Sequence, residues 1–295
     1  MATKKDNLII NGVSVVVPVY NEGNSIESTI STLSSVLSSL DIHYEIIVVN
    51  DGSIDDSANV LKKKVDLIKL VEHKSNKGYG ASLKSGIKIA KYEIIIITDA
   101  DGTYPFDIIP EIIEAMKFND MVVGSRTGES VKIPLIRRPA KWFINKLANY
   151  LSGTKIPDIN SGLRAIKTNL VNKYINLLPD GFSFTTTITL ALSCDSYNIK
   201  YIPINYGKRI GKSKIRPIHD TLNFIQLIIR TILYFKPLKV FMPISLILIA
   251  ISIGLLIYRI LFVKTFAVLI VILLLTGIQI FALALIADLI VKRTK

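Results

Sequence analysis

The stretch Glu93-Ile94-Ile95-Ile96-Ile97-Thr98-Asp99-Ala100-Asp101-Gly102 places two carboxylates directly after a run of β-branched residues. Such a run predicts a buried strand, and similar runs alternate with amphipathic helical stretches from Val13 to Gly124. This alternation is typical of a mostly parallel sheet covered by helices, so the predicted fold class is α/β. The expected strands are Val13–Val19, Glu45–Asn50, Leu67–Glu72, Glu93–Thr98 and Met121–Val123, and the expected helices are Ser25–Leu40, Asp55–Lys64, Ala81–Ala90 and Asp107–Lys117.

Polar and glycine residues follow four of the expected strands. The segments are Tyr20-Asn21-Glu22, Asp51-Gly52-Ser53, Asn76-Lys77-Gly78 and Asp99-Ala100-Asp101. In open sheets of this class, ligands bind beyond the carboxyl ends of the strands. We therefore expect the four segments to line one crevice and to form the functional site.

Asp99 and Asp101 are the candidate metal ligands. Alternate residues of an extended turn can present two carboxylate oxygens to one divalent cation, and hard ions such as Mg²⁺ or Mn²⁺ prefer these ligands. Such an ion would bridge the diphosphate of a nucleotide-sugar and stabilise the charge that grows on the leaving group. The simpler interpretation is a turn, because Asp101-Gly102 and Tyr104-Pro105 are turn-forming pairs. A nicotinamide fingerprint is excluded, because Leu83 stands where Gly78-Tyr79-Gly80 would need a third glycine.

The end of the chain predicts a membrane anchor. Phe241–Leu261 and Thr265–Leu289 each approach or exceed the roughly 20 apolar residues that cross a bilayer as a helix. The connection between them is so short that they must form an antiparallel hairpin with both outer ends on one side. Cations at those ends are Lys236, Lys239, Lys292, Arg293 and Lys295, against Arg259 and Lys264 in the connection. Their distribution predicts a cell-membrane protein whose N-terminal domain and C-terminus are cytoplasmic.

Two further stretches predict amphipathic helices on the membrane surface. They are Arg137–Leu151 and Asp220–Lys239, the second with an apolar stripe of Ile225, Ile228, Ile229 and Ile232. The alternative is ordinary packing of these helices onto the sheet. We expect a domain at residues 1–219, a juxtamembrane helix at 220–239 and the hairpin with a basic tail at 240–295.

The formal charge of +13 would suit nucleic acid, anionic lipid or phosphate-bearing ligands. The membrane spans favour lipid headgroups, and no recognised nucleic-acid module is present, so nucleic acid is not an expected partner. The single cysteine, Cys194, cannot form an intrachain disulfide, in agreement with a reducing compartment. The loop Gly207–Lys214 contains four cations and predicts an anion site, although its glycine spacing does not match a Walker A loop.

An ordered set of motifs carries a family resemblance. The motifs are Val16-Val17-Pro18-Val19-Tyr20-Asn21-Glu22, Val48-Val49-Asn50-Asp51-Gly52-Ser53, Asn76-Lys77-Gly78, Asp99-Ala100-Asp101-Gly102, Gly124-Ser125-Arg126, Asn160-Ser161-Gly162-Leu163-Arg164 and Arg209-Ile210-Gly211-Lys212-Ser213-Lys214. With the two C-terminal spans, this set resembles the dolichol-phosphate mannose synthase and polyprenyl-phosphate glycosyltransferase group of family 2 glycosyltransferases. The resemblance spans about residues 12–240, and the later motifs are the more specific ones.

The resemblance implies a GT-A fold, an inverting mechanism, Mg²⁺ or Mn²⁺, and transfer of one sugar from GDP-mannose or a UDP-sugar such as UDP-glucose to a polyprenyl or dolichyl phosphate. It implies catalytic roles for Asp99, Asp101, Arg126 and Arg209, with the two aspartates binding metal. Nucleotide-sugar contacts would come from Pro18, Tyr20, Glu22, Asp51, Lys77, Gly78, Asp99, Ala100 and Asp101. Acceptor-phosphate contacts would come from Arg126, Lys141, Asn145, Arg209 and Lys214. Relatives with two spans further suggest self-association through the hairpin.

Three residues depart from the family's pattern. Thr103 stands where many members have glutamine, which puts a third metal contact in doubt. Lys141 and Asn145 stand where relatives often carry Arg and Ser, so acceptor contacts there would differ.

The chemistry is consistent with these residues, because a phosphate monoester is already anionic and can attack a sugar carbon without a strong base. Cationic side chains must then bring the two anionic substrates together. Two rival functions are a processive polysaccharide synthase and a non-catalytic lipid-phosphate binder or translocation partner. The synthase should carry a Gln-x-x-Arg-Trp motif, and the only tryptophan, Trp142, is not in one.

Overall fold

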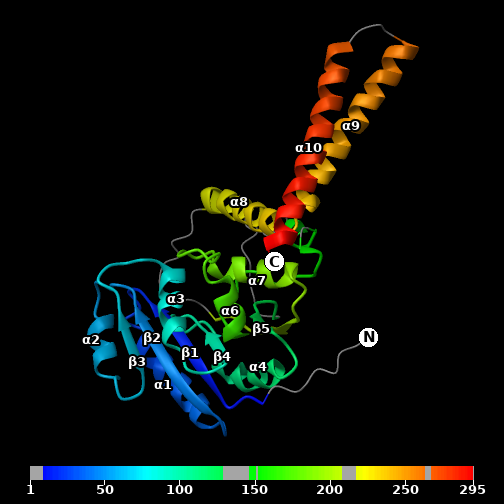
Figure 1. Ribbon diagram of the computed structural model, residues 1–295. Helices are drawn as coiled ribbons and strands as arrows, with labels where there is room; N and C mark the ends of the chain where they lie inside the picture. The colour runs from blue at the N-terminus through cyan, green and yellow to red at the C-terminus, as the bar shows by residue number, and fades with distance from the viewer. Residues whose placement is uncertain (1–8, 129–145, 151, 208–216, 263–266, 295) are drawn as a thin grey trace.

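The computed structural model describes residues 9–128, 146–150, 152–207, 217–262 and 267–294. In this part, a sheet covered by helices forms one domain, and a hairpin of two long helices projects from it (Figure 1). The strands are β1 Gly12–Val19, β2 His43–Asn50, β3 Lys69–Glu72, β4 Ile94–Ile97, β5 Met121–Ser125, β6 Arg164–Lys167 and β7 Ile199–Pro203. The helices are α1 Ile26–Ser38, α2 Ser57–Lys62, α3 Tyr79–Ile89, the 3₁₀ turn η1 Phe106–Ile108, α4 Ile109–Met116, α6 Thr168–Tyr174, α7 Phe184–Cys194, α8 Pro217–Phe235, α9 Leu238–Leu261 and α10 Ala267–Thr294.

The strands form a seven-stranded sheet in the order β3-β2-β1-β4-β6-β5-β7. Only β6 runs against its neighbours β4 and β5, and the other described pairs are parallel. The strand order reverses beside β1, and in open α/β sheets the ligand-binding crevice lies at such a reversal, beyond the carboxyl ends of the strands. Because β6 is antiparallel, its beginning lies at the same edge as the ends of β4 and β5. The predicted α/β class is confirmed.

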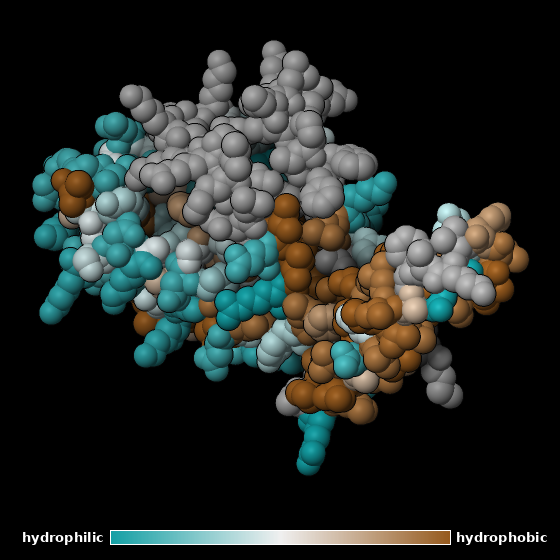
Figure 2. Space-filling model, turned by 90° about the horizontal axis from the view of Figure 1, so that it is seen from above, coloured by the Kyte–Doolittle hydropathy of each residue, from teal (hydrophilic) through white to brown (hydrophobic). Residues whose placement is uncertain are grey.

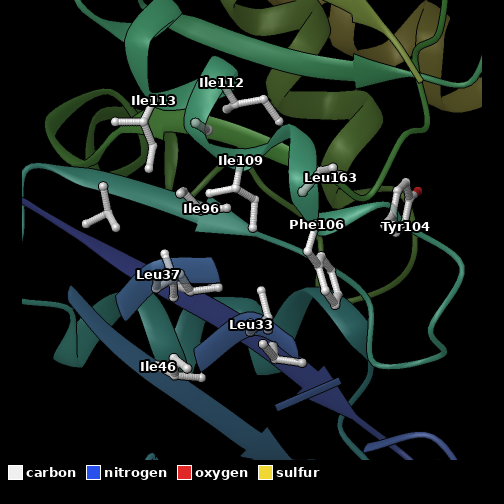
Figure 3. Close-up of a cluster of buried hydrophobic side chains, with 14 of the residues drawn as sticks. Leu33, Leu37, Ile46, Ile96, Tyr104, Phe106, Ile109, Ile112, Ile113 and Leu163 are labelled. Carbon is white, nitrogen blue, oxygen red and sulfur yellow. The ribbon is translucent and has the colours of Figure 1, made fainter. Parts of the chain in front are cut away.

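Two apolar clusters cover the two faces of the sheet. Along β4, Ile94 and Ile96 pack towards α1 and α4, whereas Ile95 and Ile97 pack towards α3 and α7. Side chains of a strand alternate between faces, so four consecutive isoleucines are required where both faces are buried. Figure 3 shows the first cluster, in which residues of α1, α4 and η1 meet Ile96. Burial of each such side chain stabilises the folded state by about 1.5–3 kcal/mol. The position of β4 is therefore well fixed, and so is the start of the polar segment that follows it.

Helices α9 and α10 are each long and apolar enough to cross a membrane. They pack as an antiparallel pair, with the Ser245 hydroxyl donating to the Gly277 carbonyl and the Ser252 hydroxyl donating to the Ile270 carbonyl, both at 2.8 Å. Most of their apolar surface is exposed, and Figure 2 shows hydrophobic residues gathered over the hairpin while hydrophilic residues cover the sheet domain. Such a surface belongs in lipid rather than in water, so the chain is a membrane protein.

Helix α8 lies between the sheet domain and the base of the hairpin (Figure 1). Its residues Ile228 and Ile232 are fully buried in the second apolar cluster, against α7. The prediction that these two residues face the bilayer is therefore wrong, and the alternative of packing onto the domain is confirmed for them. Periodicity identified the apolar stripe correctly, but a stripe does not show what covers it. The division of the chain at residues 219 and 239 stays a prediction.

Candidate active site

The loops after β1 and β2 form one wall of the crevice. The amide of Asn21 donates to the Ser53 hydroxyl at 3.0 Å, and the amide of Ile54 donates to the Asn21 side chain at 2.9 Å. Asn21 has a positive φ of 58°, a conformation that asparagine adopts more readily than most residues. Three candidate nucleotide contacts, Pro18, Tyr20 and Glu22, lie half-buried at this wall. The structure thus brings the first two predicted segments together.

The carboxylate of Asp51 holds the third segment in place. It accepts hydrogen bonds from the amides of Lys77 at 2.9 Å and Gly78 at 2.8 Å. It also lies 2.6 Å from the ring of His73, whose other nitrogen is 2.8 Å from the Ser85 hydroxyl. A charged acceptor with several hydrogen-bond partners is rigidly oriented, so Asp51 shapes the loop that ends at Gly78. Its predicted contact with a nucleoside stays a prediction, and so do those of Lys77, whose side chain is exposed, and Gly78.

The start of α3 supports the site instead of offering an open phosphate cradle. The Gly78 amide is bound to Asp51, and the Ala81 amide donates to the Asp180 carbonyl at 3.0 Å. A side chain at Gly80 would lie 2.1 Å from the Pro179 carbonyl, so only glycine permits this close approach. The helix start therefore packs against the loop that leads into α7.

Tyr79 connects this region to the acidic pair. Its hydroxyl donates to Asp99 Oδ1 at 3.0 Å, and its ring stacks on Phe182 with 5.7 Å between ring centres. Burial, reinforced by the negative charge of Asp99, raises the pKa of Tyr79 well above its ordinary value. The phenol therefore remains a hydrogen-bond donor throughout the working pH range, and it orients one oxygen of Asp99.

Tyr79→Phe is expected to weaken Mn²⁺ binding roughly tenfold, because one hydrogen bond to a charged carboxylate is lost while the stacked ring remains. The measurement is a Mn²⁺ titration in the presence of a nucleoside diphosphate. Tyr150→Phe serves as the control, because Tyr150 is exposed on a different helix. An unchanged Mn²⁺ affinity in Tyr79→Phe would show that this hydrogen bond does not organise Asp99.

The carboxylates of Asp99 and Asp101 fit a divalent cation. Asp101 Oδ1 accepts hydrogen bonds from the amide of Thr103 at 3.2 Å and from its hydroxyl at 2.6 Å. Beside Asp99, a side-chain carbon at Gly162 would lie only 2.7 Å from the carboxylate, so glycine keeps this space open. No group of three His, Cys, Asp or Glu residues forms a cage in the described part of the chain. Two carboxylates suit Mg²⁺ or Mn²⁺, because such ions complete their coordination with water and substrate phosphates.

Thr103, whose role as a third metal contact was in doubt, orients Asp101 through a hydrogen bond. Its hydroxyl is committed to Asp101, so it orients a candidate ligand. Its carbonyl accepts a hydrogen bond from the Gly207 amide at 2.9 Å. Gly207, the first residue of the basic loop Gly207–Lys214, therefore lies close to the acidic pair.

Arg126 is paired with a carboxylate that the sequence did not reveal. Its Nε and Nη2 donate to Asp158 at 2.8 and 2.9 Å, and its guanidinium lies 5.4 Å from the ring centre of Tyr206. Burial alone would raise the pKa of Asp158, but hydrogen bonds and charge from Arg126 outweigh it and lower the pKa to about 2. The ion pair fixes one edge of the Arg126 guanidinium. The Arg126 side chain remains 25% exposed. Binding of an acceptor phosphate by Arg126 stays a prediction.

Arg164 is fully buried and lies behind the site. It donates to the carbonyls of Ser161 and Thr185 and to the Thr189 hydroxyl. Burial lowers the pKa of its guanidinium. These bonds fasten the segment that contains Gly162 to α7 and so keep that glycine against Asp99.

Lys141, Asn145, Arg209 and Lys214 fall outside the residues that the structure describes. Sequence reasoning missed Tyr79, Asp158, Gly162 and Tyr206 as site residues. Tyr79 directly follows the Gly78 motif and Gly162 lies within a quoted motif, so these two carried a signal. Asp158 carried none, because its partner Arg126 is 32 residues away.

The chain matches the family model described as glycosyl transferase family 2 over residues 14–175 and the model described as GtrB C-terminal hairpin over residues 236–292. It is 27% identical over 207 residues to the dolichyl-phosphate hexose transferase of Haloferax volcanii, covering 70% of this chain and 87% of that protein. It is 30% identical over 218 residues to the dolichol-phosphate mannosyltransferase of Pyrococcus furiosus, covering 69% of this chain and 59% of that protein.

Among solved structures, the fold resembles glucosyl-3-phosphoglycerate synthase from Mycobacterium tuberculosis, crystallised with Mn²⁺, uridine diphosphate and phosphoglyceric acid. The TM-score is 0.59 at 19% identity, and the match covers 75% of this chain and 78% of that one. This likeness shows the GT-A fold. The first family model covers more than half of the 295 residues of the chain. The chain therefore belongs to glycosyl transferase family 2.

Proposed function

We propose that this enzyme transfers one sugar from a nucleotide-sugar to a polyprenyl or dolichyl phosphate and inverts the configuration of the sugar carbon. One observation carries the proposal: the same chain contains an oriented acidic pair, Asp99 and Asp101, a cationic Arg126 and a membrane hairpin. The named relatives support the same acceptor class, since both are dolichyl-phosphate sugar transferases by name.

The donor would bind along the crevice between the loops after β1 and β2 and the acidic pair. Asp99 and Asp101 would hold Mg²⁺ or Mn²⁺, which, when bound, would neutralise the diphosphate as it leaves the sugar. Tyr79 and Thr103 keep the two carboxylates in fixed orientations. The structural neighbour crystallised with Mn²⁺ and uridine diphosphate supports the use of a divalent ion.

The acceptor phosphate would bind on the Arg126 side of the crevice. The Asp158 pair leaves the guanidinium partly exposed and fixed in direction, as bidentate phosphate recognition requires. Arg209 and Lys214 follow Gly207, which is bonded to Thr103. A phosphate monoester needs no strong base, so these cations act by bringing two anions together.

The proposed location is the cell membrane, with the sheet domain and the C-terminus in the cytoplasm. Cations flank the outer ends of the hairpin, which supports this orientation. Self-association through the hairpin is part of the proposal, as the resemblance to relatives with two spans suggests.

A panel of labelled GDP-mannose, UDP-glucose and UDP-N-acetylglucosamine would identify the donor. Purified protein is incubated with each donor, a polyprenyl phosphate and Mn²⁺, and the lipid fraction is counted. One donor is expected to label the lipid. If folded protein binds the lipid phosphate but labels it from no donor, the non-catalytic binding alternative replaces this proposal.

Arg209→Ala is expected to raise the KM for the polyprenyl phosphate about tenfold or more and to change the KM for the donor less than about twofold. The reason is that a guanidinium bound to the acceptor phosphate has no contact with the donor base. Initial rates with each substrate varied in turn provide the measurement. A larger effect on the donor KM would assign the basic loop to the diphosphate.

A further inference from the structure

Two lysines join the membrane hairpin to the sheet domain. Lys236 lies just after α8, and its ammonium donates to the Ser152 carbonyl at 3.0 Å. Lys239 lies in the first turn of α9, and its ammonium donates to the Tyr150 carbonyl at 3.3 Å. Tyr150 and Ser152 belong to the end of a short helical segment, described at residues 146–150 and 152, and the last carbonyls of a helix lack partners within it. We call this set of contacts the lysine joint.

The local backbone is adapted to the lysine joint. Gly153 has a φ of 78°, and its amide donates to the Asn149 carbonyl at 2.9 Å, which ends the helical segment in a left-handed turn. A side-chain carbon at Gly153 would lie 2.8 Å from the Lys239 ammonium. The segment itself is anchored to the domain, because Ala148 is fully buried in the second apolar cluster.

The lysine joint gives these cations a role other than attraction to lipid headgroups. Their ammonium groups are directed at carbonyls of the sheet domain, where the negative end of a helix favours positive charge. Lys292, at the other outer end of the hairpin, instead pairs with Asp288 of its own helix at 2.8 Å. The contacts of the lysine joint therefore cross from the start of the anchor to the domain that carries the site.

We infer that Lys236 and Lys239 are positioning residues that hold the active site at the height of a bilayer-embedded acceptor phosphate. The inference rests on the proposed function. A lipid phosphate is confined to the headgroup layer, so the crevice must be kept at that depth for the reactants to align, and small displacements are costly. A short acceptor dissolved in water has no such constraint and reaches the crevice at any height.

The test compares two acceptors in a Lys236→Met/Lys239→Met variant, which keeps the apolar stems and removes the ammonium groups. With undecaprenyl phosphate in phosphatidylcholine vesicles, kcat/KM is expected to fall roughly tenfold. With water-soluble citronellyl phosphate and no vesicles, it is expected to change less than about twofold. Lys292→Met removes one cation from the other end of the hairpin and is expected to match the wild type with both acceptors.

Gly153→Ala provides a second variant that retains both lysines but displaces Lys239. It is expected to show the same selective loss with the vesicle-bound acceptor. An equal loss with both acceptors, or no loss with undecaprenyl phosphate in the double variant, would overturn the positioning role while leaving the proposed function intact. A wild-type protein that uses neither acceptor would overturn the proposed function itself.

Discussion

Asp101→Asn is expected to reduce sugar transfer by a factor of about 10² or more while the protein stays folded. Asparagine retains an oxygen that can accept the hydrogen bonds of the Thr103 amide and hydroxyl, so the turn is preserved. The negative charge is lost, and with it a ligand for a divalent ion. The measurements are initial transfer rates and Mn²⁺ binding to the same preparation.

Asp107→Asn is the matched control for this experiment. Asp107 is exposed in η1, six positions beyond Asp101, and no described contact joins it to the acidic pair. It is expected to retain wild-type rates and Mn²⁺ affinity. Full activity in Asp101→Asn would contradict the metal assignment.

Asp158→Ala is expected to destabilise the sheet domain by about 3–5 kcal/mol, because removing one partner of a buried ion pair leaves the Arg126 guanidinium without its carboxylate. For a domain of this size, that change lowers the midpoint of thermal unfolding by more than about 6 °C. Asp180→Ala is the control, since its ion pair with Lys84 lies at the surface and is worth less than about 1 kcal/mol. Unfolding of detergent-solubilised protein is followed by circular dichroism.

The contribution of Asp158 to the free energy of unfolding should also depend on pH. Its pKa is about 2 in the folded protein, below the ordinary value of 3.8, so the ionised form is favoured by folding. A lowered carboxyl pKa stabilises the protein above the unfolded pKa, and this stabilisation is lost as the pH falls from about 4 towards 2. The shift corresponds to about 2 kcal/mol. The difference in the midpoint of thermal unfolding between wild type and Asp158→Ala should therefore decrease as the pH falls below 4. A difference that stays constant would contradict this account.

Local patterns predicted the first half of the fold well. The isoleucine run of β4 and the valine run of β1 are apolar on both faces, as strands of a sheet covered on both faces require. Strands β6 and β7 were not predicted. The β6 sequence Arg164-Ala165-Ile166-Lys167 is short and has one β-branched residue, and its pairing with β4 and β5 depends on distant parts of the chain. Tertiary contacts, not local propensity, specify such strands.

The site was predictable to the extent that its residues follow strands. The segments after β1, β2 and β4 meet because parallel strands end at one edge. The pairs that orient them, such as Tyr79 with Asp99 and Arg126 with Asp158, join residues 20 and 32 positions apart and have no periodic signature. The same holds for Lys236 and Ser152 in the lysine joint. Long-range hydrogen bonds of this kind become visible only in the folded chain.

The central claim is that a polyprenyl phosphate is the acceptor of a metal-dependent sugar transfer. The most direct measurement supplies the labelled donor selected from the panel with undecaprenyl phosphate or with undecaprenol, each with Mn²⁺ or with chelator. We expect labelled lipid only from the phosphate with Mn²⁺, because the cationic side of the crevice requires a phosphate and the acidic pair requires an ion. Equal labelling of undecaprenol, label in a growing polymer, or labelling that persists under chelation would contradict this account.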